Sequence, residues 1–228
     1  MADTIITVQG EYSAWYPAEQ ATVRAAVHVD GPKRDDVFSR AVGGSNAVRT
    51  LTEKIFDANA GPVTWWTSDS VRVWSERPWN NDGTQLAPIF HSALDFAVKF
   101  TDFDALARWV EATATIDGVT VDSVSWDLTE TTRAAATNDV RSRAVKDAVT
   151  KATVYAQSIG LTSVRAIALA DPGMLGGPAG GATAPSPVFA RAAMRAQAFE
   201  GGGGTPQLAL RPEEIAVASV VDARFTAS

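Results

Sequence analysis

The chain contains no cysteine. Disulfides, thiolate nucleophiles, cysteine-ligated zinc and iron–sulfur clusters are therefore excluded. There is also no G-x-S-x-G elbow, HExxH motif or P-loop. Gly43-Gly44-Ser45 and the GGPAGG run lack the preceding strand and the following Gly-Lys-Ser/Thr that phosphate binding requires. From these absences we expect no cofactor and no enzymatic activity.

Long apolar runs and an excess of positive charge are also absent. No segment approaches the ~18 apolar residues of a membrane span, so we expect no membrane insertion. Residues 1–4 lead into a strand-like run without a secretory signal, which predicts a cytoplasmic protein as written; a lost signal peptide would instead imply a periplasmic or exported protein. With 20 basic and 26 acidic side chains, no nucleic-acid partner is expected.

The longest run with helical periodicity covers residues 131–160. Ala144, Ala148 and Ala152 recur every four residues and form a small apolar face, which suits close packing against a sheet or another helix. Gly160 is a natural helix terminator because glycine readily adopts the left-handed conformation. We therefore expect this helix to be the central packing element.

Most of the remaining chain alternates between apolar and polar residues, as half-buried strands do. Two other segments have helical apolar stripes, and Gly43-Gly44 should loosen or kink the first of these helices. Thr101-Asp102 can cap the second. The predicted strands are 4–16, 19–30, 69–78, 90–100, 119–130, 162–170 and 213–226, and the two helices are 32–57 and 101–115.

Turn residues predict how some strands connect. Tyr16-Pro17-Ala18 would join the first two strands as a long hairpin, and Asp82-Gly83 is a hairpin signal between the next two. A change of apolar phase near Asp122-Ser123 indicates a bulge. The predicted fold is α+β, with a largely antiparallel sheet of about seven strands packed against three helices in a single domain, 1–228.

Glycine and proline are concentrated between about residues 172 and 206. Such a segment buries too little apolar area to offset its ordering entropy, so we expect it to be flexible. Within it, residues 188–199 have helical composition. Phe189 and Met194 would form an apolar patch there.

Three stretches resemble the SIMPL-domain family, the family of a Brucella periplasmic antigen also described as an outer-membrane protein. Residues 6–11 (ITVQGE) resemble its opening strand, and residues 144–169 (AVKDAVTKATVYAQSIGLTSVRAIAL) resemble its alanine-rich helix and the strand that follows. Residues 185–228 resemble its proline-flanked Arg-Ala segment and its valine-rich terminus.

The resemblance implies a kinked, mainly antiparallel sheet against helices, and assembly into ring- or channel-like oligomers. It also implies a loose link to export and to envelope or oxidative stress, with no settled enzymatic activity. The chain departs from the family in its glycine-rich run after Asp171 and in lacking a signal peptide as written.

His28 and His91 are the only two histidines, and both fall on the polar faces of predicted strands. If those strands were neighbours, His28, His91 and Asp95 would be able to form a metal or acid–base cluster. Isolated histidines on exposed strand positions more often serve solubility, so we favour that interpretation.

Tryptophan is the most suggestive residue type. Exposed indoles are typical of sugar-stacking or protein-binding surfaces, although burial in the core or in a subunit contact is the more common role. The candidate ligand or interface residues are Trp65, Trp66, Trp74, Trp79, Phe189 and Met194.

Three functions are consistent with these features. The favoured one is a non-enzymatic, self-assembling scaffold of the SIMPL type, because the outer strands of the predicted sheet lack a blocking proline. A small-ligand or glycan-binding module using the tryptophans is the alternative, and an enzyme is the third. We expect a homo-oligomer.

Overall fold

The computed structural model describes residues 4–175 and 210–228. Within these residues the chain forms three helices and eight strands in two antiparallel sheets, which confirms the α+β prediction. The elements are β1 (Thr4–Pro17), β2 (Gln20–Gly31), α1 (Arg34–Glu53), β3 (Val63–Ser68), β4 (Arg72–Glu76), β5 (Ile89–Phe100), α2 (Phe103–Ala114), β6 (Val119–Asp127), α3 (Glu130–Ser158), β7 (Val164–Ala170) and β8 (Glu214–Ala227).

The described residues divide into two compact units, each with its own hydrophobic core. We call them the three-stranded unit (4–16, 130–175 and 216–228) and the five-stranded unit (17–129 and 210–215). Residues 17–129 of the five-stranded unit therefore lie, in the sequence, between β1 and α3 of the other unit.

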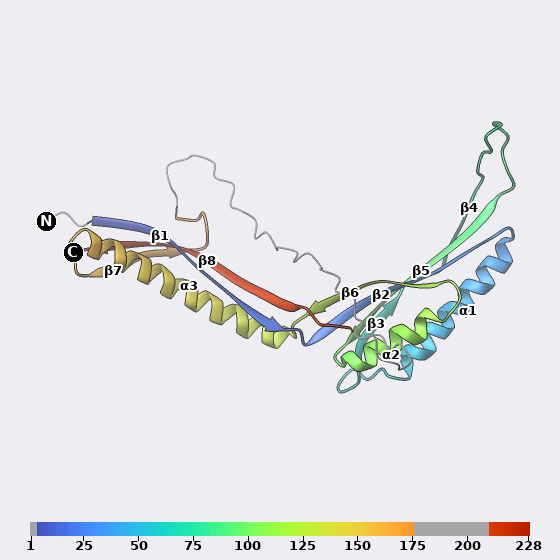
Figure 1. The fold of residues 1–228 in the computed structure, drawn as a ribbon, viewed down its shortest axis with the longest axis horizontal. Coiled ribbons are helices and arrows are strands. Elements are labelled where there is room, and N and C mark those ends of the chain that lie inside the picture. The colour runs from blue at the N-terminus through green and yellow to red at the C-terminus, as the bar shows by residue number, and fades with distance from the viewer. Residues whose placement is uncertain (1–3, 176–209) are drawn as a thin grey trace, which may run out of the picture. The chain divides into compact units, whose positions relative to one another are not determined.

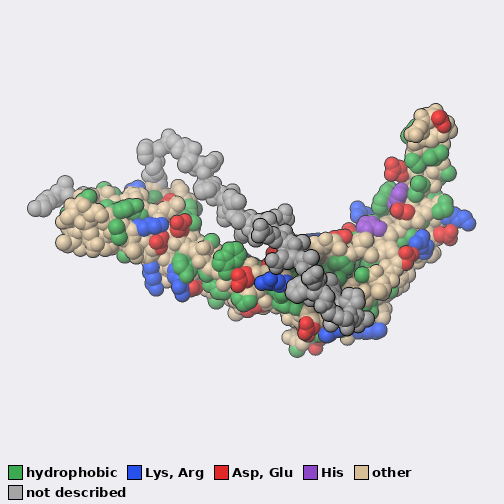
Figure 2. Space-filling view, in the orientation of Figure 1, with side chains coloured by type: hydrophobic (Ala, Val, Ile, Leu, Met, Phe, Trp, Pro, Cys, Tyr) green, Lys and Arg blue, Asp and Glu red, His purple; other side chains and the backbone are tan. Residues whose placement is uncertain are grey.

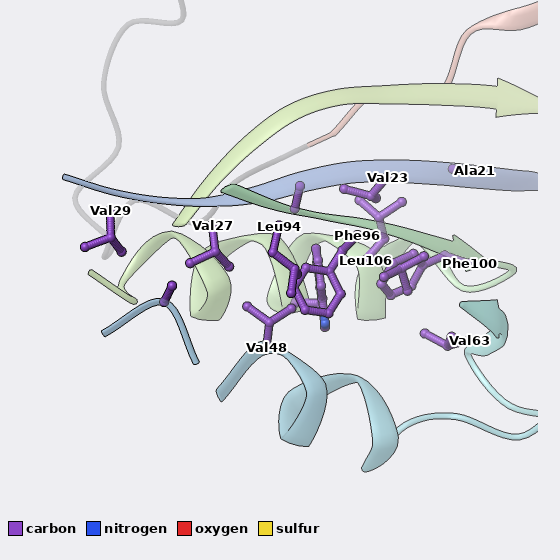
Figure 3. Packing of buried hydrophobic residues seen from close by; sticks show 14 of the residues in the cluster. Ala21, Val23, Val27, Val29, Val48, Val63, Leu94, Phe96, Phe100 and Leu106 are labelled. Carbon is purple, nitrogen blue, oxygen red and sulfur yellow. The ribbon is translucent and has the colours of Figure 1, made fainter. Parts of the chain in front are cut away.

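In the five-stranded unit the strand order is β3-β5-β2-β6, and β4 pairs with the first half of β5. α1 and α2 pack on the same face of this sheet (Figure 1). Alternation along β2 and β5 directs every second side chain to the helices. Figure 3 shows these side chains meeting Val48 of α1 and Leu106 of α2.

α1 passes through Gly43-Gly44 without a break. Gly44 is buried, and a Cβ added there would lie 3.1 Å from Cγ1 of Val27 on β2. The glycine thus lets the helix backbone approach the sheet closely, which favours its presence despite its low helix propensity.

The three-stranded unit has the order β1-β8-β7, with α3 packed against the sheet. Gly10 of β1 is the point of closest approach, because a Cβ there would lie 2.7 Å from the Cβ of Ala148 and would overlap the carbonyl oxygen of Ala144. The predicted alanine face of α3 is confirmed as buried. Its buried residues are Ala136, Val140, Ala144, Ala148, Ala152 and Ala156.

Several local predictions are confirmed. Asp102 caps α2 by accepting a hydrogen bond from the Ala105 N–H (2.9 Å), and Gly160 ends α3 with φ +81°. Gly83 (φ +73°) lies in the turn between β4 and β5. The β2–β6 register shifts opposite Asp122, so the predicted bulge is present.

The predicted hairpin of the first two strands is wrong. β1 pairs with β8, whereas β2 pairs with β5 and β6 in the other sheet. Alternation tells which face of a strand is buried but not which strand lies beside it, so two adjacent strands were assumed to pair. The last strand is also not an outer strand of the sheet. β8 lies between β1 and β7.

The predicted strand at 69–78 is also wrong in its bounds. Only β4 lies within this range, and β3 precedes it. The two short strands pair with different halves of β5. Between the two strands, the Asp69 N–H still donates a backbone hydrogen bond to the Asp95 carbonyl on β5 (2.9 Å). The strand at 63–68 was missed, so the strands number eight instead of about seven among the described residues.

Candidate functional site

Alternation along β3 and β4 separates the tryptophans between two environments. Trp65 lies opposite Lys99 and Trp74 opposite His91, on the sheet face that points away from α1 and α2. We call this the open face; the two indoles there are 47% and 48% exposed. Trp66 points the other way and packs against the hydrophobic core. Of the adjacent pair, only Trp65 is therefore available to a ligand.

Trp74 belongs to a row of side chains that crosses three strands. Its indole stacks on the imidazole of His91, with ring centroids 5.5 Å apart and planes at 24°. Nδ1 of His91 lies 2.6 Å from Oδ1 of Asp30, the residue opposite it on β2. The carboxylate orients the imidazole, and the imidazole supports one face of the indole.

The same face carries two further contacts. Arg72 of β4 lies 3.7 Å from the carboxylate of Asp95 on β5. At the other end of β5, the ammonium of Lys99 lies 5.9 Å from the ring centroid of Trp65, within the range of a cation–π contact. Each exposed indole of the open face thus has a polar neighbour that restricts its orientation.

Trp79 lies apart from this row, near the turn of the β4–β5 hairpin. It is 67% exposed and forms a bridge with Gln85, while the amide oxygen of Asn80 accepts a 2.7 Å hydrogen bond from the Thr84 N–H. Figure 1 shows this turn at the end of a projecting arm, and Figure 2 shows hydrophobic side chains along it, interspersed with acidic and histidine side chains. The candidates Phe189 and Met194 lie outside the described residues.

The suggested His28/His91/Asp95 cluster does not form among the described residues, and His28 lies opposite Ala93. β2 and β5 are neighbours, as the hypothesis required, but His91 pairs with Asp30, and Asp95 pairs with Arg72. Within residues 4–175 and 210–228, no group of three histidine or carboxylate side chains is placed to hold a metal ion. Asp30 alternates with His28 along β2, but its register opposite His91 of β5 leaves no signal in the sequence.

A small cavity of about 240 Å³ lies on the helix side of the same sheet. It is lined by Arg34, Asp35 and Phe38 of α1 and by Val73 of β4. These side chains include one acid, one base and two apolar residues.

A polar cluster in the three-stranded unit lies where α3 crosses the outer edge of β1. The Asp147 carboxylate accepts a 2.9 Å hydrogen bond from the Glu11 N–H, and the Lys151 ammonium donates a 3.1 Å bond to the Gln9 carbonyl. Lys151 and Asp147 also pair with each other at 2.8 Å. These bonds satisfy backbone groups that an added strand would use, so this part of the edge is blocked.

The same contacts shift the pKa values of the two side chains. The Lys151 hydrogen bond, followed by the Glu11 N–H, lowers the pKa of Asp147. The Asp147 hydrogen bond raises the pKa of Lys151. One turn earlier, Arg143 lies over the ring of Tyr12 and pairs with Asp139, whose hydrogen bond raises the pKa of the guanidinium. The cluster is therefore a charged clamp between α3 and β1.

A protein-family model matches this chain. The model of the SIMPL family, described as proteins of unknown function (DUF541), matches residues 6–225, nearly the whole chain. The chain belongs to the SIMPL family. No curated protein matches it. The family assignment confirms the resemblance seen in the sequence and supplies no activity.

None of the helices in the described part of the chain is both long enough and apolar enough to cross a membrane.

Proposed function

We propose that this SIMPL protein is a non-enzymatic scaffold that self-associates, with a role connected to the cell envelope or to stress. The observation that carries the proposal is the exposed edge of the three-stranded sheet at β7. This strand pairs with β8 on one side and is the last strand in the sheet order. A sheet edge with unpaired backbone groups is a template for a strand from a second copy.

The side chains of β7 strengthen the case. Ile167 is 49% exposed and Leu169 is 54% exposed. The opposite edge, β1, is blocked in part by Asp147 and Lys151 of α3. β7 presents these two exposed apolar side chains and is therefore the contact that we propose. A closed, symmetric assembly is expected, because an open head-to-tail contact would give fibres.

Size-exclusion chromatography with light scattering tests the proposal. At micromolar concentration the full chain should elute as a defined species larger than its 24.1 kDa monomer. Replacing Ile167 and Leu169 together with lysine should shift that species toward the monomer, because two charges would be buried in the contact.

The matched control is Val154→Lys, which places a charge at a 51% exposed position of α3 in the same unit. It should leave the assembly unchanged. A monomeric wild-type chain would refute the scaffold, and an oligomer insensitive to the double lysine variant would refute the β7 contact.

A second candidate function is a small-ligand or glycan-binding module. The observation that favours it is the half-exposure of Trp65 and Trp74 on the open face. Titration of tryptophan fluorescence with candidate ligands tests it, since binding against these indoles should change their emission.

A further inference from the structure

We propose that the open face of the five-stranded sheet binds a neutral, linear oligosaccharide that lies along β5 between Trp74 and Trp65. The inference rests on the second candidate function and specifies its ligand. It is independent of self-association through β7, which belongs to the other unit.

The spacing of the two indoles requires an extended ligand. Trp74 pairs with His91 and Trp65 with Lys99, eight positions apart on β5 and on the same face. At about 3.3 Å per residue the indoles are separated by roughly 26 Å along the strand. A single sugar therefore contacts one indole only, whereas a chain of several sugars reaches both.

Short side chains lie along β5 between the two indoles. Ala93 and Ala97 of β5 alternate there with Asp95, and Ala26 of β2 lies opposite Asp95. Ala26 and Ala93 are nearly fully buried (1% and 3% exposed), so a ligand that follows the strand contacts mainly the longer polar side chains beside them. The Arg72–Asp95 pair offers hydrogen-bond donors and acceptors suited to sugar hydroxyls.

The indoles are restrained before a ligand arrives. Trp74 rests on His91, which Asp30 holds, and Trp65 has Lys99 against its ring. A restrained ring loses less conformational entropy on binding, which favours affinity. The apolar face of a pyranose ring fits flat against such an indole, because C–H groups meet the electron-rich aromatic face.

Charge on this face favours a neutral ligand. Three basic and three acidic side chains of β2, β4 and β5 point to it, so a polyanion gains no net attraction. These are Arg24, Arg72, Lys99, Asp30, Asp95 and Glu76. A protein partner would bury the ion pairs at a desolvation cost, whereas a hydroxylated ligand keeps them hydrogen-bonded.

Isothermal titration calorimetry of the full chain tests the inference. The probes are linear hexasaccharides of β-1,4-glucose, α-1,4-glucose and β-1,4-N-acetylglucosamine, with heparin as the polyanion. At least one hexasaccharide should bind, and its trisaccharide should bind at least about tenfold more weakly because it reaches one indole. Heparin should not compete.

The variants Trp65→Ala and Trp74→Ala should each weaken hexasaccharide binding about tenfold or more, in line with the loss of an aromatic anchor. Trp65→Phe and Trp74→Phe should restore part of the affinity, which separates stacking from a folding defect. Trp79→Ala is the matched control, an exposed indole of the same hairpin region outside this row, and should bind as the wild type does.

Two results would overturn the inference in distinguishable ways. If a hexasaccharide binds with the same affinity to Trp65→Ala and Trp74→Ala, the site is wrong but a ligand-binding function stands. If no hexasaccharide binds, or heparin alone binds, the oligosaccharide inference is wrong, and the fluorescence titration decides separately whether a small ligand binds. Light scattering of the same samples reports separately on self-association.

Discussion

Gly10 shows how one residue sets the distance between a helix and a strand. Its Cα lies so close to α3 that an added Cβ would overlap the backbone at Ala144 and approach Ala148. Backbone atoms are unable to rotate away as a long side chain would. The glycine in the family-like ITVQGE stretch therefore has a packing role.

Gly10→Ala should lower the free energy of unfolding by about 1–3 kcal/mol, the usual cost of overpacking. Urea denaturation followed by circular dichroism measures this. The matched control is Gly43→Ala in α1, where nothing lies within 4 Å of the added Cβ. The control should be neutral or gain about 0.5–1 kcal/mol from helix propensity. Equal effects of the two substitutions would contradict the role given to Gly10.

Asp147 of α3 accepts a hydrogen bond from the Glu11 N–H and so blocks part of the edge of β1. Its pKa is lowered by Lys151 and by the Glu11 N–H, so its carboxylate favours the folded state. That contribution is complete above the unfolded-state pKa and disappears as pH falls through the lower folded-state pKa. It is thus present at neutral pH and lost only in acid.

Asp147→Asn should therefore lower the urea midpoint at pH 7 and have a smaller effect below the pKa of the folded carboxyl, where the wild-type side chain is itself neutral. The side chain is about one-third exposed (32%), so the difference will be modest. Midpoints measured from pH 7 downward give the comparison. A difference between the two proteins that does not change with pH would show that the charge of Asp147 is unimportant.

At the scale of elements, α3 depends on its row of small residues. Ala148 is fully buried at 0% exposure, while the neighbouring Val149 is 40% exposed. The helix has little apolar bulk and relies on close contact with β1 and β8. Larger side chains in the row would push α3 away from the sheet.

Ala148→Leu should destabilise the protein by about 1–3 kcal/mol through overpacking against β1. Val149→Leu, one position along the same helix, is the control and should change stability little. Thermal unfolding by circular dichroism distinguishes them. An unchanged melting curve for Ala148→Leu would mean that this face of α3 tolerates bulk and is not closely packed.

At the scale of the whole molecule, the two hydrophobic cores share no residue among residues 4–175 and 210–228. Separate cores allow separate cooperative transitions. The seven tryptophans are unequally divided, because only Trp15 lies in the three-stranded unit. Tryptophan fluorescence therefore reports mainly on the five-stranded unit, whereas circular dichroism also reports on α3.

We expect unfolding in two steps. Gly10→Ala should shift the circular dichroism transition to lower urea and leave the fluorescence midpoint close to that of the wild type. Leu94→Ala, in the core of the five-stranded unit, should do the reverse by lowering the fluorescence midpoint. If both probes moved together in both variants, the chain would be one cooperative unit.

The sequence by itself determined the local features of this protein. Helix α3, its alanine row, the Asp102 cap, the glycine at the end of α3 and the bulge at Asp122 all follow from patterns that neighbouring residues impose on each other. The sequence left open whether Trp65 and Trp74 are exposed or buried. Alternation defines two faces of a strand without showing which face is covered.

Only the tertiary structure decided which strands meet. It separated β1 from β2, placed β8 inside a sheet, divided the strands between two sheets, and set Asp30 beside His91. Each of these is a pairing between distant residues, whose register depends on packing of the whole unit and leaves no periodic signal in either strand. The candidate glycan surface arises from such pairings, so its residues were visible in the sequence but their arrangement was not.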